Sequence, residues 1–547
     1  MPMTPELRQK VDQIRNDLYG GGYPNPVANA EQVSFLFFFY LIEGIDAQNH
    51  SRARVTKQKY TSLFAGEWML RNPLNAASKD EKTIPADRLR WSSWARGLSG
   101  DNLVRFVRDE VFPFYAEIAA QGATNFMDGA RLGLDDPAVL GKLVTDVDAL
   151  RLDQTDADTK GDLFEHVLRQ IKQAGELGQF RTPRHVIRAI VAMVDPQIGD
   201  TIYDPAAGTA GFLVAAYNHI RLAHSSNAAI ETVEVDGKPQ RRGLGDKLKQ
   251  AQQSQLANRT FYGNDVDPQM VRLATMNLTL RGLPNVRILR RNVLTTSLDA
   301  QQRADLGLPD SYDVILANPP FSGRLDRDRV VEDVKVGNTG ATEILFLKYM
   351  LDSLTQGGRC GVIVPEGVLF GSTGAHREIR RMLIENNTVE AVLSLPGGVF
   401  QPYSGVKTSV LLFRKGGATQ RVLFLHADND GYKLDANHDQ PIDADDLPAL
   451  IDAYRTCGDR WAEWQATQGS SPVHSATPWT KNWWFASAEQ LRANDYNLSA
   501  SRYRPLNQAQ VEHRDPRELL DELAALEAEI ASEVDALRVT LADEAAE

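Results

Sequence analysis

The chain has 547 residues, which is too long for a single compact core and predicts two or three domains. Its apolar content of 42% and charged content of 24% are those of an ordinary water-soluble protein. The formal net charge of −12 argues against a chain that grips nucleic acid alone, because such proteins usually present a basic surface. If nucleic acid is the substrate, we expect a partner to supply much of the phosphate contact.

Residues 1–160 carry helical signals and few strand-like runs, which predicts an all-helical N-terminal domain. Thr4 and Pro5 suit the cap and first turn of an initial helix. The most hydrophobic run, residues 33–42, is about half the length needed to cross a bilayer and predicts a buried helix. The first residues lack the apolar core of a signal peptide, so no membrane contact is expected.

Residues 161–430 alternate short β-rich runs with helical ones, which is typical of an α/β domain with a doubly wound, mostly parallel sheet. Ligands of such sheets bind outside the carboxyl ends of the strands. Residues 408–427 predict a hairpin that turns at Gly416 and Gly417 and gives antiparallel strands at one edge. The candidate strands are residues 201–205, 260–266, 286–291, 312–320, 360–365, 389–396 and 408–415.

Two polar stretches interrupt this pattern, and a C-terminal region follows it. Residues 224–260 are interpreted as an excursion and residues 322–340 as a charged loop beside the site. We expect residues 431–508 to form a C-terminal extension and residues 509–547 an acidic helix. Its apolar residues step by three and four, so it packs on its own body or docks on a partner subunit: Leu519, Leu523, Leu526, Ile530, Val534, Leu537 and Leu541.

The chain contains two cysteines, Cys360 and Cys457, and neither has the spacing of a metal ligand. One pair of thiols cannot crosslink a chain of this length, so we expect a reducing, cytoplasmic location and no metal.

The first chemical signal is the stretch YDPAAGTAGF, residues 203–212. Tyr203 closes a strand, and Asp204 then precedes Pro205 and a loop of small residues that leads into a helix. Small residues let the backbone approach a ligand closely, and a helix N-terminus favours an anionic group. A tight strand–helix turn without a ligand is the alternative.

The second signal is YGNDVDP, where Asp265 and Asp267 follow the next strand. An acid at this place commonly accepts hydrogen bonds from ribose hydroxyls. Asp267 precedes Pro268 and suits a helix N-cap. We therefore predict that Asp265 faces a ligand and that Asp267 is structural.

The third signal is DVILANPPFSG, in which a buried strand ends on Asn318, Pro319, Pro320 and Phe321. The Asn318 amide offers an acceptor oxygen, and the prolines present carbonyl oxygens on a stiff backbone without N–H groups. Phe321 offers a flat apolar face. Together they suit a planar group with an exocyclic NH₂, whose nitrogen lone pair would be directed toward an electrophile. A proline-terminated strand with an ordinary core phenylalanine is the alternative.

This ordered set resembles the modification (methylation) subunits of type I restriction-modification systems, which are N6-adenine DNA methyltransferases that use S-adenosylmethionine. The resemblance extends to GELGQFRTPRHVI before the first loop, LPGGVFQPYSGVKTSVLLF after the third, and DYNLSASRY near the end. It implies a catalytic motif of Asn318, Pro319, Pro320 and Phe321 that receives a flipped adenine. The implied cofactor-binding residues are Gln179, Phe180, Arg181, Thr182, Pro183, Arg184, Asp204, Ala206, Ala207, Gly208, Thr209, Asp265 and Asn292.

Two positions depart from the family pattern. Relatives often have two aromatic residues where this chain has Phe180 and Arg181. Asn292 stands where an Asp is frequent, although an amide can still bond the cofactor adenine.

The resemblance also implies partners: double-stranded DNA, a separate specificity subunit that binds two copies of this chain, and a nuclease or translocase subunit. The region after residue 415 leaves no obvious room for a large target-recognition domain, and no GxxxxGK[ST] phosphate loop occurs. The rival interpretations are a stand-alone DNA adenine methyltransferase, a methyltransferase of protein glutamine or RNA, and a scaffold with a decayed site.

Overall fold

The computed structural model describes residues 4–56, 59–70, 82–120, 127–173, 182–283, 285–401, 404–435, 438–468 and 482–505, with isolated positions between 524 and 534. The predicted C-terminal helix therefore lies almost entirely outside the described residues. Within the described part, no helix has the length and apolar character needed to span a membrane.

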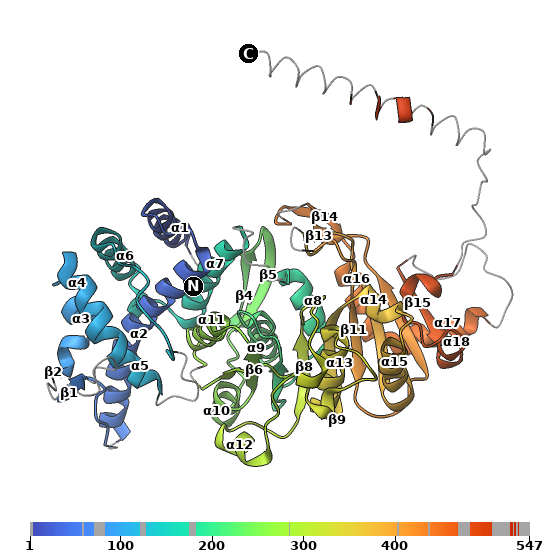
Figure 1. The fold of residues 1–547 in the computed structure, drawn as a ribbon, viewed down its shortest axis with the longest axis horizontal. Helices are drawn as coiled ribbons and strands as arrows, with labels where there is room; N and C mark the ends of the chain where they lie inside the picture. Colours follow the sequence, from blue (N-terminus) through green and yellow to red (C-terminus); the bar gives the residue numbers. More distant parts are fainter. Residues whose placement is uncertain are drawn as a thin grey trace.

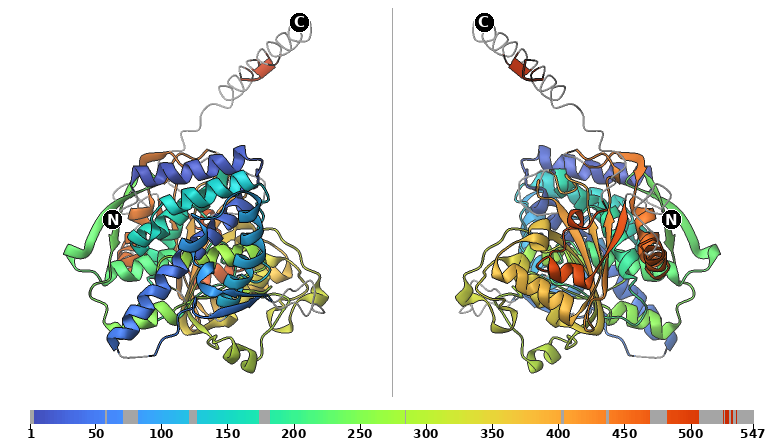
Figure 2. Two further views of the ribbon diagram at one scale, coloured as in Figure 1. Left: turned by 90° about the vertical axis from the view of Figure 1, so that its left-hand side faces the viewer. Right: turned by 90° about the vertical axis from the view of Figure 1, so that its right-hand side faces the viewer.

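The N-terminal region is helical, as predicted, and gathers at one end of the molecule (Figures 1 and 2). Thr4 caps the first helix by accepting a hydrogen bond from the Leu7 N–H, and the hydrophobic run of residues 33–42 lies in the second helix. A short strand pair, β1 (Glu67–Leu70) and β2 (Lys82–Pro85), is added to the helices. The helices are α1 (Pro5–Gly20), α2 (Pro26–Thr56), α3 (Trp91–Trp94), α4 (Gly100–Phe106), α5 (Phe112–Ala120), α6 (Pro137–Ala149) and α7 (Ala157–Gln173).

The central sheet of the described chain has nine strands in the order β15-β12-β10-β11-β9-β8-β3-β6-β7. The pairs on either side of β3, from β9 to β7, are all parallel, whereas β11 and β15 are antiparallel to their neighbours. The strands are β3 (Ile202–Asp204), β6 (Phe261–Asp265), β7 (Arg287–Arg290), β8 (Tyr312–Ala317), β9 (Leu354–Pro365), β10 (Thr388–Ser394), β11 (Thr408–Arg414), β12 (Arg421–His426) and β15 (Trp483–Ser487). The first strand, β3, lies between β6 and β8, so the strand order reverses there and opens a crevice for a ligand.

The predicted hairpin at residues 408–427 is wrong, because β10 lies between β11 and β12. The start of β10 holds the glycine turn in place. The Gly416 N–H donates to Asn387 Oδ1 at 2.8 Å, and Thr388 Oγ1 donates to the Gly416 carbonyl at 3.1 Å. The two strands therefore straddle β10, and β12 pairs in parallel with it.

Helices pack against the sheet in two groups. Helix α8 packs on α9 and on β8 and β9, whereas α13 packs on α15, with α13 against β9 and α15 against β10. The helices after α7 are α8 (Arg184–Val194), α9 (Gly211–Ala223), α10 (Gln250–Asn258), α11 (Pro268–Thr279), α12 (Ala300–Asp305), α13 (Thr342–Ser353), α14 (Glu366–Phe370), α15 (Gly374–Asn386), α16 (Leu447–Arg455), α17 (Cys457–Gln468) and α18 (Ala488–Ala493).

Besides β1–β2, two more strand pairs of the described chain stand outside the central sheet, and the sequence did not reveal them. Residues 224–260 contain β4 (Ile230–Val235) and β5 (Lys238–Gly243), and β13 (Asp430–Tyr432) pairs with β14 (Pro441–Asp445). Asp236 and Gly237 form the turn between β4 and β5 with φ of 54° and 75°. An Asp-Gly pair between strands is the expected signal for such a turn.

Helix α11 joins the two hydrophobic cores of the described chain. One side contributes Val271, Ala274 and Leu278 to the core around the sheet. The other side packs into the core of the N-terminal helices with Met270, Leu273, Met276 and Leu280. Because apolar residues on two sides of α11 are buried in different cores, this helix fixes the N-terminal region to the sheet.

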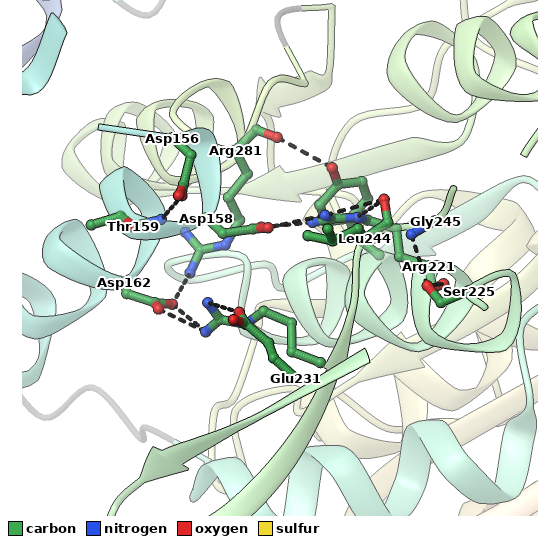
Figure 3. A network of polar contacts seen from close by, with 12 residues as sticks. Asp156, Asp158, Thr159, Asp162, Arg221, Ser225, Glu231, Leu244, Gly245 and Arg281 are labelled. Atoms are coloured by element: carbon green, nitrogen blue, oxygen red, sulfur yellow. Dashed lines mark hydrogen bonds and ion pairs between the residues drawn. The ribbon is translucent and has the colours of Figure 1, made fainter. Parts of the chain in front are cut away.

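Ion pairs add a second connection along α7 (Figure 3). Asp158 accepts two hydrogen bonds from Arg221, at 2.6 and 3.0 Å, and Asp162 accepts two from Arg242, at 2.7 and 2.8 Å. Arg281 donates to Glu165 at 3.0 Å. The Arg221–Asp158 pair is bidentate and fixes orientation as well as distance, so it holds α7 against the sheet domain.

Candidate active site

The loop after β3 is held against the end of β6. The Ala207 N–H donates to the Asn264 carbonyl and the Gly208 N–H to Asp265 Oδ2, each at 2.9 Å. Gly208 has a φ of 51°, a conformation that glycine adopts without strain. A Cβ on Gly263 would lie 3.1 Å from the Ala207 side chain, so a glycine on β6 permits the close approach. The small residues of the loop thus allow its backbone to pack closely against the end of β6.

Two carboxyl groups lie at this place and both titrate abnormally. Burial, together with the nearby Asp265 carboxylate, raises the pKa of Asp204 to about 8, although the hydrogen bond from the Ala206 N–H opposes the shift. Burial also raises the pKa of Asp265. Both residues line the same cavity. A buried pair of acids is stabilised in its ionised form by a cation, so this part of the cavity suits a positively charged ligand group.

Two neighbouring polar residues make local hydrogen bonds and also line the cavity. Asp267 caps α11 by accepting from the Gln269 N–H at 2.8 Å, with Pro268 in the first turn. Asn292, after β7, accepts from the Leu294 N–H at 3.1 Å. Asp267 is therefore the helix cap that the sequence predicts, and it shares the cavity with Asp265.

In the Asn318 amide at the end of β8, the nitrogen has a hydrogen-bond partner within the described part of the chain and the oxygen does not. Its Nδ2 donates to Thr182 Oγ1 at 2.9 Å. Its Oδ1 is buried and accepts no hydrogen bond from the described residues. A buried acceptor without a donor costs free energy unless a ligand supplies one. The residue lines the cavity, so the amide is ready to accept a hydrogen bond from a bound group.

Phe321 is placed differently from the rest of the motif. Its ring packs edge-on against Phe400, with centroids 5.3 Å apart, and the side chain is 5% exposed. Of the motif, Asn318 and Pro320 are among the described residues that line the cavity, whereas Pro319 and Phe321 are not. The stacking role of Phe321 stays a prediction.

One cavity of about 1370 Å³ brings the predicted residues together at the strand ends. Those that line it are Thr182, Arg184, Asp204, Ala206, Ala207, Gly208, Thr209, Asp265, Asn292, Asn318 and Pro320. Gln179, Phe180 and Arg181 lie outside the described residues. Pro183 is the N-cap of α8.

Sequence reasoning missed one wall of this cavity. Residues of the β4–β5 pair, including Asp236 and Arg242, line it together with Asp162 and Glu165 of α7. Arg184 lies between the two, 3.4 Å from Glu165 and 3.9 Å from Asp236. The Asp-Gly turn would have revealed the strand pair, but no sequence signal places it over the crevice.

His185, Asp430 and His438 form a cluster of residues of the types that bind metal ions. His185 Nε2 and His438 Nε2 lie 2.8 and 2.9 Å from Asp430 Oδ2. Burial alone would raise the pKa of Asp430, but hydrogen bonds from the two imidazoles outweigh it and hold the pKa below its usual range. Tetrahedral ligands of zinc stand about 3.4 Å apart at normal bond lengths. The shorter separation between His185 and Asp430 is that of a hydrogen bond, which links α8 to β13.

The order of the sheet and the cavity at its reversal point are those of a doubly wound α/β fold with a ligand site at the strand ends. The N-6 DNA methylase family model matches residues 155–513, which is more than half of the chain. The chain therefore belongs to the N-6 DNA methylase family, which confirms the prediction of an adenine-specific DNA methyltransferase.

Known proteins agree with this assignment. The type I restriction enzyme EcoEI methylase subunit of Escherichia coli is 29% identical over 475 residues, 83% of this chain and 86% of that one. The EcoKI methylase subunit of Escherichia coli (strain K12) is 28% identical over 63% of this chain and 61% of its own length. These relatives confirm the resemblance to type I modification subunits.

Solved structures share the fold. A chain from a study of complex assembly and conformational transition of the type I R-M system is 25% identical, with a TM-score of 0.64, and the match covers 99% of this chain and 100% of that one. The type I restriction-modification methyltransferase subunit of Streptococcus thermophilus is 17% identical, with a TM-score of 0.60, over 91% and 99% of the two chains. The predicted doubly wound fold behind a helical N-terminal region is thus confirmed.

Proposed function

We propose that this chain transfers a methyl group from S-adenosylmethionine to N6 of an adenine flipped out of double-stranded DNA, as the modification subunit of a type I restriction-modification complex. The observation that carries the proposal is the buried, unsatisfied Asn318 Oδ1 in the cavity that Asp204 and Asp265 also line. An exocyclic amine supplies the missing donor. The cationic cofactor suits the two acids.

The residues present fit the cofactor and would hold it in parts. Bound S-adenosylmethionine would supply an electrophilic methyl group on a sulfonium. Asp204 and the loop to Thr209 would hold its methionine end, Asp265 its ribose hydroxyls and Asn292 its adenine. These roles follow from the family resemblance, and the common cavity supports them.

The Asn318 side-chain oxygen and the Pro319 carbonyl would each accept a hydrogen bond from one N–H of the target amine. The nitrogen lone pair would then be directed toward the methyl group. Extrusion of the base costs a few kcal/mol, which binding in the pocket offsets. Alignment and charge placement would then supply most of the rate acceleration. Cytosine-C5 chemistry is disfavoured, because Cys360 is buried and its pKa is raised by that burial.

Sequence recognition would come from a separate specificity subunit that binds two copies of this chain, in the cytoplasm, with a nuclease or translocase subunit completing the assembly. The net charge of −12 supports a partner that contributes phosphate contacts. The test is to purify the chain with the proteins that bind it, supply labelled S-adenosylmethionine and duplex DNA, and map methylated adenines. Methylation confined to one sequence supports the proposal, whereas labelled protein or RNA refutes it.

The stand-alone enzyme is the second candidate, and an electrophoretic mobility shift separates the two. Tight, sequence-specific binding of duplex DNA by the isolated chain would favour the stand-alone enzyme. Calorimetry with S-adenosylmethionine separates both candidates from a scaffold with a decayed site, which would bind no cofactor.

A further inference from the structure

We propose that Thr182 is a positioning residue that sets the orientation of the Asn318 amide, a role that rests on the proposed function. Thr182 Oγ1 accepts the hydrogen bond from Asn318 Nδ2 at 2.9 Å, although 136 residues separate the two in the chain. Thr182 is buried, with 7% of its surface exposed. The family resemblance places Thr182 in the cofactor pocket, whereas this contact assigns it to the amide that receives the target base.

The need for a positioning residue follows from the chemistry of an amide. An asparagine side chain presents an acceptor oxygen on one side and a donor NH₂ on the other. A target amine bears two hydrogens and needs acceptors. If the Asn318 amide were rotated by half a turn, its NH₂ group would face the amine, donor against donor. The Thr182 hydroxyl oxygen gives Nδ2 a partner and so leaves Oδ1 for the ligand.

The hydroxyl is itself held in place by the segment that carries it. Thr182 precedes Pro183, whose ring fixes the backbone and whose carbonyl accepts the Ile187 N–H at 3.0 Å in the first turn of α8. Arg184 donates to the Glu165 carbonyl on α7 at 3.3 Å. The positioning group therefore stands on a helix start that is anchored to both the sheet and the N-terminal helices.

The experiment compares three variants of the full chain, purified with the proteins that bind it. Thr182→Val replaces the hydroxyl by a methyl group of the same shape. Thr182→Ser keeps the hydroxyl. Thr145→Val makes the same substitution at an exposed position on α6, where the threonine hydroxyl bonds the Gly141 carbonyl of its own helix. The readouts are the single-turnover rate of methyl transfer to DNA at saturating S-adenosylmethionine and the cofactor Kd from calorimetry.

We expect Thr182→Val to lower the rate by about tenfold or more, as does loss of a group that orients a reacting centre. The cofactor Kd should stay within about threefold of the native value, because the hydroxyl bonds the amide. Thr182→Ser should restore most of the lost rate, and Thr145→Val should behave as the native protein. If Thr182→Val does not fold, Thr182→Ala removes the hydroxyl without adding bulk and takes its place.

Three results would overturn the inference. An unchanged rate in Thr182→Val, beside an inactive Asn318→Ala, would refute the positioning role and leave the proposed function intact. A cofactor Kd that weakens in step with the rate would make Thr182 a cofactor contact. Methyl transfer that survives in Asn318→Ala would refute the proposed function, and the inference with it.

Discussion

The raised pKa of Asp204 makes cofactor binding depend on pH. The carboxyl has a pKa of about 8 in the free protein, because it is buried and lies near Asp265. S-adenosylmethionine carries an ammonium and a sulfonium, so it would stabilise the ionised form and lower that pKa. Binding should therefore release a proton, and the affinity should rise with pH until the carboxyl is ionised in the free protein as well.

The magnitude follows from the fraction of Asp204 that is ionised before binding. A pKa of about 8 leaves roughly a tenth of the protein ionised at pH 7 and about a hundredth at pH 6. The apparent Kd should thus be about tenfold weaker at pH 7, and about a hundredfold weaker at pH 6, than the plateau above pH 8.5. Isothermal titration calorimetry at several pH values measures the slope. Repetition in buffers of different ionisation enthalpy measures the released proton directly.

Asp204→Asn is the matched control. It keeps an oxygen for the Ala206 N–H, which donates to Asp204 Oδ1 at 3.0 Å, but it cannot ionise. The variant should bind more weakly than the native protein at pH 8.5 and show a shallower slope, because Asp265 still titrates in the cavity. A native Kd that is flat from pH 6 to 8.5, or an undiminished slope in Asp204→Asn, would refute the reasoning.

Three further predictions concern the site and the ion pairs beneath it. Asn318→Ala or Phe321→Ala should abolish methyl transfer in a labelled-cofactor assay and leave the cofactor Kd within about threefold; a large loss of affinity in the Phe321 variant would contradict its assignment to the base. Asp265→Ala should weaken cofactor binding by about tenfold or more, because a ribose hydroxyl loses a charged acceptor; an unchanged Kd by calorimetry would contradict this. Asp158→Ala should lower the free energy of unfolding by about 2 kcal/mol, because Arg221 stays buried without a carboxylate; denaturant titration measures it, and an unchanged midpoint would show that the pair contributes nothing.

The sequence predicted the sheet because its strands carry local signals. Short β-rich runs between helical stretches gave all of the strands from β3 to β11 except the β4–β5 pair. The pairing of the strands was harder to predict. Gly416 and Gly417 have the composition of a tight hairpin, yet β10, which precedes both strands in the chain, lies between β11 and β12. A local turn signal therefore cannot exclude an inserted strand.

The sequence predicted that the site residues lie together at the strand ends, but it did not reveal that the β4–β5 pair lines the same cavity. Asp204, Asp265, Asn292 and Asn318 meet because parallel strands deliver their carboxyl ends to one edge of a sheet. The β4–β5 pair lies over the cavity because of a tertiary contact, the ion pair between Arg242 and Asp162 on α7. That pairing depends on two charged residues with no local pattern, so the sequence could not place the pair over the crevice.

The predicted base pocket has two parts, the Asn318 acceptor and the Phe321 ring, and only the acceptor is already arranged for a ligand. The acceptor is formed, because Thr182 already holds the Asn318 amide. The aromatic ring is buried, and Phe321 and Phe400 form a T-shaped pair. A T-shaped aromatic contact is worth about 0.5–1.5 kcal/mol, and a base stacked on an aromatic ring about 1–3 kcal/mol. Exchange of one contact for the other is therefore neutral to favourable, so the buried ring does not argue against capture of the base, and the part of the pocket that is already formed is the acceptor that must align the amine.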